Sequence, residues 1–248
     1  MDRRTFLHLS LAGAGALAVG CGPEAAVPSE PLPLGEGLLA FAHGQAYELE
    51  PLARRISHGG APVLTDLNYP VAAAGLPGGG LAVLDRGDAV LVTVAGGRVH
   101  TLAAEALGSP VDLAVSEGRL FVTDAADHTV VVLDRAGRVL DRWGGFSLPR
   151  GIAAGPDGTL HVEDAGHGRI RTFAPDGAEG EAYGAEADWW LPRPIAVDEA
   201  GHSYVGCPTR QAVYVFGPDR ALTARRPLEV APVHLGISDA GRVHVGAV

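Results

Sequence analysis

The sequence contains little cysteine, little positive charge and no apolar run long enough to span a membrane. Its 248 residues include two cysteines, Cys21 and Cys207, whereas a disulfide-stabilised fold would show several at patterned spacing. The 19 basic residues, all arginine, are outnumbered by 29 acidic residues, and the formal net charge is −10. This balance argues against nucleic acid as a partner. The uncharged stretch at residues 9–20 is too short for a membrane-spanning helix, which needs about 20 apolar residues.

Glycine and proline, by contrast, are abundant, with 35 and 18 copies. Hydrophobic residues make up 47% of the chain and charged residues 19%. Many turn residues between short apolar runs are typical of many short strands. A helical bundle is excluded because it would need far fewer helix-breaking residues. An all-β barrel or propeller of this length commonly forms a single unit.

The first residues have the pattern of an export signal, because Arg3 and Arg4 precede the apolar stretch. The run RRTFL from Arg3 resembles the twin-arginine translocation signal, in which the receptor reads the arginine pair. The run AVGC that ends at Cys21 resembles a bacterial lipobox. This resemblance implies that Cys21 receives the lipid and becomes the mature N-terminus, and that the acyl chains then anchor the protein.

We therefore expect a signal peptide at residues 1–20 and a lipidated, proline-rich tether at residues 21–36. Prolines in the tether prevent helix formation and favour an extended chain. Residues 37–248 are expected to form the folded domain. The expected location is the bacterial cell envelope, lipid-anchored on the outer side of the cytoplasmic membrane or in the periplasm or outer membrane.

Five segments of the folded domain share one pattern: a proline, an apolar stretch, a turn with glycine and a second apolar stretch. They begin 39 to 43 residues apart, at Pro70, Pro110, Pro149, Pro192 and Pro232. A third apolar stretch, and usually a fourth, follows each of the first four. Valine, isoleucine, leucine and aromatic residues in short runs indicate strands. A ring of four-stranded sheets buries both faces of each sheet, so the repeat predicts an all-β propeller of five or six blades.

The two ends of this domain look incomplete. Residues 37–57 look like the outer strands of a blade that lacks its inner strand, and residues 232–248 look like inner strands that lack outer ones. We expect these two segments to pair and close the ring.

Residues 151–177, GIAAGPDGTLHVEDAGHGRIRTFAPDG, resemble a repeat of the NHL β-propeller family. The shared features are the inner strand led by Pro149, the glycine turn, the closing Asp164 and the basic Arg169 at the third strand. The closing aspartate recurs as Asp85 and Asp124, and we expect these carboxylates to accept backbone N–H bonds. Other repeats depart from the pattern, since Cys207 replaces the aspartate in one of them; we expect it to be a buried thiol.

Similar propellers include enzymes, namely amidating lyases with metal-binding histidines and calcium-dependent lactonases. In the lyases a histidine commonly follows the inner-strand proline, but this chain has other residues there: Val71, Val111, Arg150, Arg193 and Val233. Asp112 is the sole acidic residue at an expected inner-strand start, whereas a calcium ion takes six to eight oxygen ligands. The missing metal ligands, together with the arginines and tryptophans expected at the rim, therefore favour a binding or scaffold propeller for a protein partner or an acidic small ligand, without a cofactor. The alternative is a metal-dependent lyase or lactonase that uses zinc or calcium, so enzymatic activity stays open.

The expected binding surface is the rim of the central channel. Its candidates are Arg150, Arg193, Trp189, Trp190, His234 and Asp112. Each of the two arginines follows an inner-strand proline, so both are expected at the channel mouth on neighbouring blades. There they either bind a carboxylate or phosphate or pair with acids of the chain such as Asp112. The adjacent tryptophans either plug the core or form an exposed recognition surface.

A metal site has weaker candidates. His161 and Glu163 alternate along one strand and so share a face. His128 and His167 lie in turns that follow a second strand. Each of these side chains has an ordinary alternative role in packing or in a turn.

Overall fold

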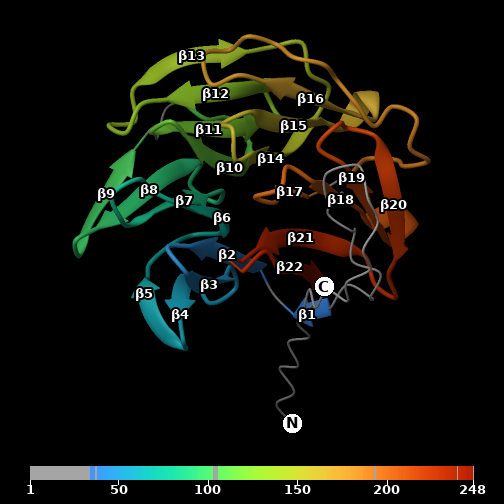
Figure 1. Ribbon diagram of the computed structural model, residues 1–248. Coiled ribbons are helices and arrows are strands. Elements are labelled where there is room, and N and C mark those ends of the chain that lie inside the picture. The colour runs from blue at the N-terminus through green and yellow to red at the C-terminus, as the bar shows by residue number, and fades with distance from the viewer. Residues whose placement is uncertain (1–33, 37, 103–105, 193, 239, 248) are drawn as a thin grey trace, which may run out of the picture.

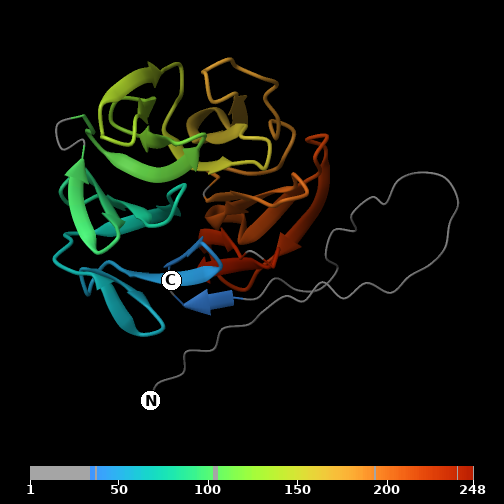
Figure 2. The same cartoon turned by 60° about the vertical axis from the view of Figure 1, so that its left-hand side comes forward.

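Six β-sheets stand around a common axis, and one edge strand of each sheet lies nearest the centre (Figures 1 and 2). The computed structural model describes residues 34–36, 38–102, 106–192, 194–238 and 240–247. The expected β-propeller is confirmed. Within these residues the helices are two 3-10 turns, η1 (Ala165–His167) and η2 (Pro208–Arg210). Neither of them has the length or apolar character needed to cross a membrane.

The first three blades each contain four antiparallel strands. Blade 1 contains β2 (Leu38–Ala42), β3 (Gln45–Glu50), β4 (Arg55–His58) and β5 (Ala61–Leu64). Blade 2 contains β6 (Pro70–Gly75), β7 (Leu81–Asp85), β8 (Val90–Ala95) and β9 (Arg98–Leu102). Blade 3 contains β10 (Pro110–Ser116), β11 (Arg119–Asp124), β12 (Thr129–Leu133) and β13 (Val139–Trp143).

The remaining blades are less regular. Blade 4 contains β14 (Pro149–Ala154), β15 (Leu160–Asp164) and β16 (Arg169–Phe173), and isolated bridges to Glu179 and Tyr183 take the place of a fourth strand. Blade 5 contains β17 (Ile195–Val197), β18 (Ser203–Cys207), β19 (Ala212–Phe216) and β20 (Leu222–Pro227). The sixth sheet, blade 6, contains β21 (Pro232–Ile237), β22 (Val243–Ala247) and β1 (Leu34–Glu36).

Strands from the two ends of the described chain close the ring, because β1 pairs with β22 in parallel. The expected partner was wrong, however. Residues 37–57 do not pair with β21 or β22; they contribute β2, β3 and most of β4 to a complete blade that has its own inner strand. This inner strand was missed because β2 begins at Leu38, without the proline that marks other inner strands.

Inner strands that begin with proline share an irregularity. In β6, β10, β14 and β21 the strand register shifts directly after the buried proline. Proline has no N–H to donate, so it suits the first position of a strand, and a bulge re-aims the residue beside it. The residue after each of these prolines therefore occupies an equivalent position, at the register shift, in its blade.

The closing aspartates tie the start of each inner strand to the end of the second strand. Asp124 accepts backbone N–H bonds from Gly108 at 2.6 Å and from Ser109 at 2.9 Å. Asp85 and Asp164 form corresponding bonds in blades 2 and 4. The expected structural role of these carboxylates is confirmed, and such bonds to buried acceptors hold the loops at the channel face.

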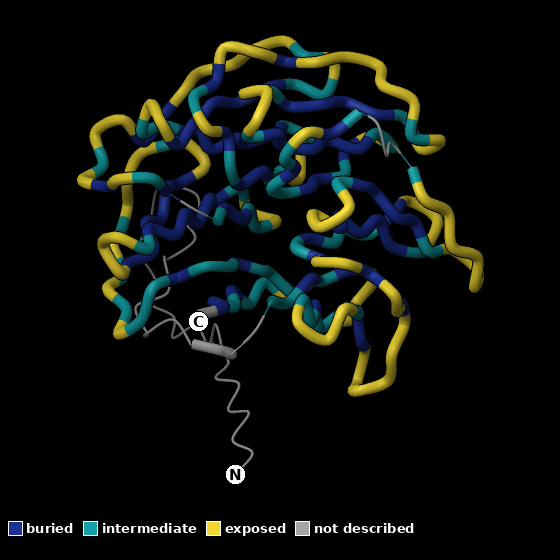
Figure 3. Tube along the Cα trace, turned by 180° about the vertical axis from the view of Figure 1, so that it is seen from behind, coloured by how far each residue is buried: buried dark blue, intermediate teal, exposed yellow. Residues whose placement is uncertain are grey.

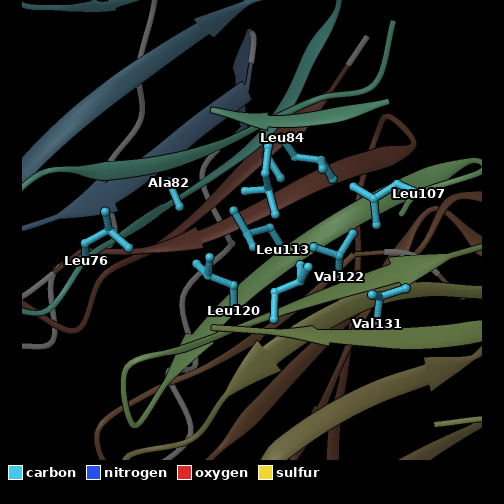
Figure 4. Close-up of a cluster of buried hydrophobic side chains, with 11 residues drawn as sticks. Leu76, Ala82, Leu84, Leu107, Leu113, Leu120, Val122 and Val131 are labelled. Carbon is cyan, nitrogen blue, oxygen red and sulfur yellow. The ribbon is translucent and has the colours of Figure 1, made fainter. Parts of the chain in front are cut away.

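The hydrophobic core is divided among the joints between blades. Five clusters of buried apolar residues each lie between two consecutive blades, from blade 1 through to blade 6. The second and third strands of blades 2 to 5 are mostly buried, the inner strands mix buried and half-buried residues, and exposed segments lie in the outer strands and loops (Figure 3). Figure 4 shows the cluster between blades 2 and 3, which includes Leu84, Leu120 and Val122, all fully buried. Burial of each such side chain contributes about 1.5–3 kcal/mol.

Candidate ligand-binding site at the channel mouth

A pocket of about 520 Å³ opens at the end of the channel where the inner strands begin. This pocket, here called the mouth, continues into a narrower space of about 200 Å³ between the inner strands. Its volume lies in the range of small-molecule sites, about 300–1,000 Å³. Its wall is mostly aliphatic, and its titratable residues are Arg86, Asp112, Arg150, His234 and Tyr69.

Residues at the starts of five inner strands form a ring around the mouth. We call this ring the collar; it contains Leu38, Val71, Val111, Arg150 and Val233. All except Leu38 follow an inner-strand proline, where the register shifts. Among the described residues of this ring, four are aliphatic and one, Arg150, is a cation. The sequence showed only that Val71, Val111 and Val233 stand where the lyases have histidine. It did not predict that these valines line a pocket.

Arg150 is the basic residue of the collar. Its backbone carbonyl accepts a hydrogen bond from the Thr123 hydroxyl of blade 3, which fixes the start of β14 against β11. Arg193, expected beside it, lies outside the described residues. Arg86, also at the mouth, is exposed to solvent.

Asp112 follows the collar residue Val111 and joins two blades. Its carboxylate accepts the N–H of Leu113 at 2.8 Å and the N–H of Ile152, in blade 4, at 3.1 Å. Burial inside the channel disfavours the charged form and raises the pKa of Asp112 to about 7, although the two backbone donors oppose this shift. This carboxyl is thus close to half-protonated at neutral pH.

His234 follows Val233 and joins blade 6 to blade 1. Its Nε2 lies within hydrogen-bond distance of the Leu39 carbonyl oxygen. A carbonyl only accepts, so Nε2 carries the proton and Nδ1 of the neutral ring is an acceptor. Burial lowers the pKa of His234, which keeps the imidazole uncharged. Asp112, Arg150 and His234 are therefore the expected rim residues that meet at the mouth.

The two tryptophans have different environments. Trp189 is 7% exposed, packs on Tyr214 and Phe216, and donates its indole N–H to the Gly168 carbonyl at 2.8 Å. Trp190 is 67% exposed and does not line the mouth. One tryptophan thus plugs the core between blades 4 and 5, and the other is available at the surface.

Asp188 and Cys207 both make contacts within blade 5 and its loops. Asp188 pairs with Arg210. Cys207 is fully buried, as expected, and its thiol lies 3.6 Å from the Trp190 carbonyl oxygen. The cysteine thus occupies the place of the closing aspartate without supplying a carboxylate.

The weaker metal candidates lie in separate surroundings. His161 Nδ1 is 2.9 Å from the Tyr183 hydroxyl, and burial lowers the pKa of His161 to about 4. Glu163 is fully buried and accepts the Gly151 N–H at 2.8 Å. Within the described ranges, no three His, Cys, Asp or Glu side chains form a group that could hold a metal ion.

The two turn histidines, His128 and His167, form hydrogen bonds that hold loops in place. His128 Nδ1 accepts the N–H of Leu148 at 3.0 Å. His167 Nδ1 lies 2.8 Å from the carboxylate of Asp164, which also pairs with Arg169. This last ion pair joins the two charged residues that carried the resemblance to the NHL repeat.

No protein-family model and no curated protein matches the sequence. Solved structures do match. A gluconolactonase from Xanthomonas campestris is 23% identical, with 86% of this chain and 82% of that chain covered and a TM-score of 0.72. A streptogramin B lyase is 15% identical, with 84% and 75% covered and a TM-score of 0.70. A nidogen/laminin complex contains a chain that is 20% identical, with 82% and 81% covered and a TM-score of 0.66. At these identities the similarity establishes the propeller fold.

Proposed function

We propose that this chain is an exported, lipid-anchored NHL-like β-propeller that binds a protein or an acidic small ligand at the channel mouth. The observation that carries the proposal is the collar, in which Arg150 is set among aliphatic side chains. A guanidinium binds a carboxylate through two parallel hydrogen bonds, and such pairs are stronger where water is scarce. The mouth thus offers a site for an acidic group.

The other polar groups of the mouth have structural roles that join neighbouring blades. Both carboxylate oxygens of Asp112 are engaged by backbone N–H groups. His234 directs its Nε2 to a carbonyl of the neighbouring blade. These contacts brace the blades around the pocket. Propellers of similar fold have very different activities, so the fold itself does not favour the lyase or lactonase alternative.

The test replaces the two predicted rim arginines together, as Arg150→Gln with Arg193→Gln. The matched control is Arg98→Gln with Arg138→Gln, which removes the same charge from exposed positions of blades 2 and 3. We expect the rim variant to lose a partner in pull-down from cell-envelope extracts while its melting temperature stays unchanged. Full retention of every partner by the rim variant would contradict the proposal.

The alternative activity is tested by metal analysis of protein purified without chelators. A binding module needs no bound metal, so we expect zinc and calcium well below one equivalent. Near-stoichiometric content of either metal would favour the lyase or lactonase.

A further inference from the structure

The joint between blades 6 and 1 differs from the other joints of the ring. Among the described residues, clusters of buried apolar side chains fill the five joints from blade 1 through to blade 6, and the joint between blades 6 and 1 has none. A groove of about 410 Å³ lies there instead. We call it the side groove; its lining includes Leu39, Phe41, Ala46 and Glu48 of blade 1 and Arg242 and His244 of blade 6.

The side groove exists because blade 6 is small and one face of blade 1 stays uncovered. Blade 6 contains three strands, and one of them, β1, is three residues long. In β2, Ala40 and Ala42 are buried against blade 2, so the alternating residues Leu39 and Phe41 face blade 6. Both are only half-buried, although the Phe41 ring lies 4.7 Å from the His244 ring. The described part of the chain thus leaves apolar side chains of this face without a full cover.

Arg242 supplies the permanent positive charge of the side groove. Its backbone N–H donates to Ser238 Oγ at 3.2 Å, whereas its guanidinium has no hydrogen-bond, ion-pair or aromatic partner within the described residues. Glu48, the acidic residue of the groove, pairs with Leu39 and so lies nearer to the mouth. The end of the groove away from the mouth therefore suits an acidic group that is flanked by apolar ones.

The described chain begins beside this end of the groove. β1 runs parallel to β22 with Leu34 opposite Val245, so the residues before Leu34 lead toward Val243 and away from the mouth. Two residues of extended chain, about 7 Å, cover this distance. The preceding segment, residues 22–33, lies outside the described residues; its sequence GPEAAVPSEPLP has two acidic residues, no basic residue and four prolines.

We propose that residues 22–33 dock in the side groove and complete the joint between blades 6 and 1. The carboxylate of Glu30, four residues before Leu34, pairs with Arg242, and the apolar residues and prolines of the segment cover Leu39 and Phe41. Proline-rich chain is already extended, so it binds aromatic-lined grooves at a low cost in entropy.

Docking changes how the propeller is held at the membrane, a consequence that rests on the lipid anchor of the proposed function. Twelve extended residues reach about 37 Å at about 3.1 Å per residue. Once these residues lie in the side groove, Cys21 adjoins the propeller. The domain is then held close to the lipid surface and does not move at the end of a long tether.

Disulfide trapping in the full chain with Cys21→Ser tests the docking. The remaining native thiol, Cys207, is fully buried. The groove pair is Val27→Cys with Ala46→Cys, at an exposed position of β3 that lines the groove. The matched control is Val27→Cys with Gln45→Cys, the exposed neighbour on the other face of β3. We expect the groove pair to form an intramolecular disulfide at least tenfold faster than the control pair in the same oxidant.

The charge contact is tested in the groove pair by a double-mutant cycle. Arg242→Gln and Glu30→Gln should each slow the disulfide several-fold, and both together should slow it no more than either alone, because they remove one contact. Arg138→Gln, at a side chain that is 81% exposed on blade 3, should have no effect. Additive effects of Arg242→Gln and Glu30→Gln overturn the ion pair.

The remaining outcomes decide the occupant of the side groove. Equal rates for the groove pair and the control pair overturn the docking. A disulfide-linked dimer on a non-reducing gel overturns the intramolecular contact and assigns the groove to the same segment of a second copy. Ala46→Cys and Gln45→Cys replace exposed side chains of one hairpin, so both should keep the wild-type melting temperature. The test uses neither a ligand of the mouth nor the lipid, so its failure is distinct from failure of the proposed function.

Discussion

Asp112 should make the stability of the propeller depend on pH. Its pKa is about 7 in the folded protein, against an ordinary value near 4 in the unfolded chain. Between these values the folded state holds a proton that the unfolded state has lost. The free energy of unfolding therefore falls as pH rises through this window, and the loss is complete above pH 7. Asp112→Asn keeps the shape of the protonated acid and removes the titration.

The magnitude follows from the pKa difference. One pKa unit corresponds to about 1.4 kcal/mol, so the ceiling for Asp112 is about 4 kcal/mol. The side chain is partly accessible in the channel, and water there reduces the effect, so we expect about 2 kcal/mol. For a domain of this size that is about 4–8 °C in melting temperature. The amide cannot accept both N–H bonds of the carboxylate, which costs about 1 kcal/mol at every pH.

The measurement is the melting temperature of the wild type and of Asp112→Asn at intervals from pH 4.5 to pH 8, by circular dichroism. We expect the variant to be less stable at the acid end and to match or exceed the wild type at pH 8. Glu186→Gln, at an exposed carboxyl, is the control and should parallel the wild type. A difference between wild type and Asp112→Asn that stays constant across this range would refute the reasoning.

Three further predictions concern packing, closure and anchoring. Trp189→Ala should lower the free energy of unfolding by about 3–5 kcal/mol and Trp190→Ala by less than about 0.5 kcal/mol, as measured by urea denaturation; equal losses would contradict the assigned burial. Removal of residues 232–248 should lower the melting temperature by at least about 10 °C, because β21 and β22 share a buried cluster with blade 5 and pair with β1; an unchanged value would mean that closure contributes nothing. Cys21→Ser should move the protein from the membrane fraction to the soluble fraction, and a variant that stays membrane-bound would rule out the lipobox.

Much of the blade architecture was predictable, because it is encoded locally. Short runs of β-branched and aromatic residues between glycine turns determine strands wherever they occur. The leading prolines and the closing aspartates act within one blade, as in the bonds from Gly108 and Ser109 to Asp124. The repeat period therefore indicates the propeller without any knowledge of the contacts between blades.

The contacts between blades were less predictable, because the residues next to a position in the sequence do not identify which residue of another blade it will contact. Trp189 and Trp190 are the same residue type in the same loop, yet only Trp189 meets Tyr214 and Phe216. Blade 1 looked incomplete because its inner strand has no leading proline. The parallel pairing of β1 with β22 joins the two ends of the described chain, and no local pattern specifies it.

The sequence by itself determined the strand repeat, the acidic balance and the residue that follows each inner-strand proline. Only the tertiary structure decided that Val71, Val111, Val233 and Arg150 form one collar with Leu38. It also decided that Asp112 and His234 brace neighbouring blades beneath that collar. The physical reason is that strand formation depends on neighbours along the chain, whereas a channel forms only when several separate blades meet around one axis.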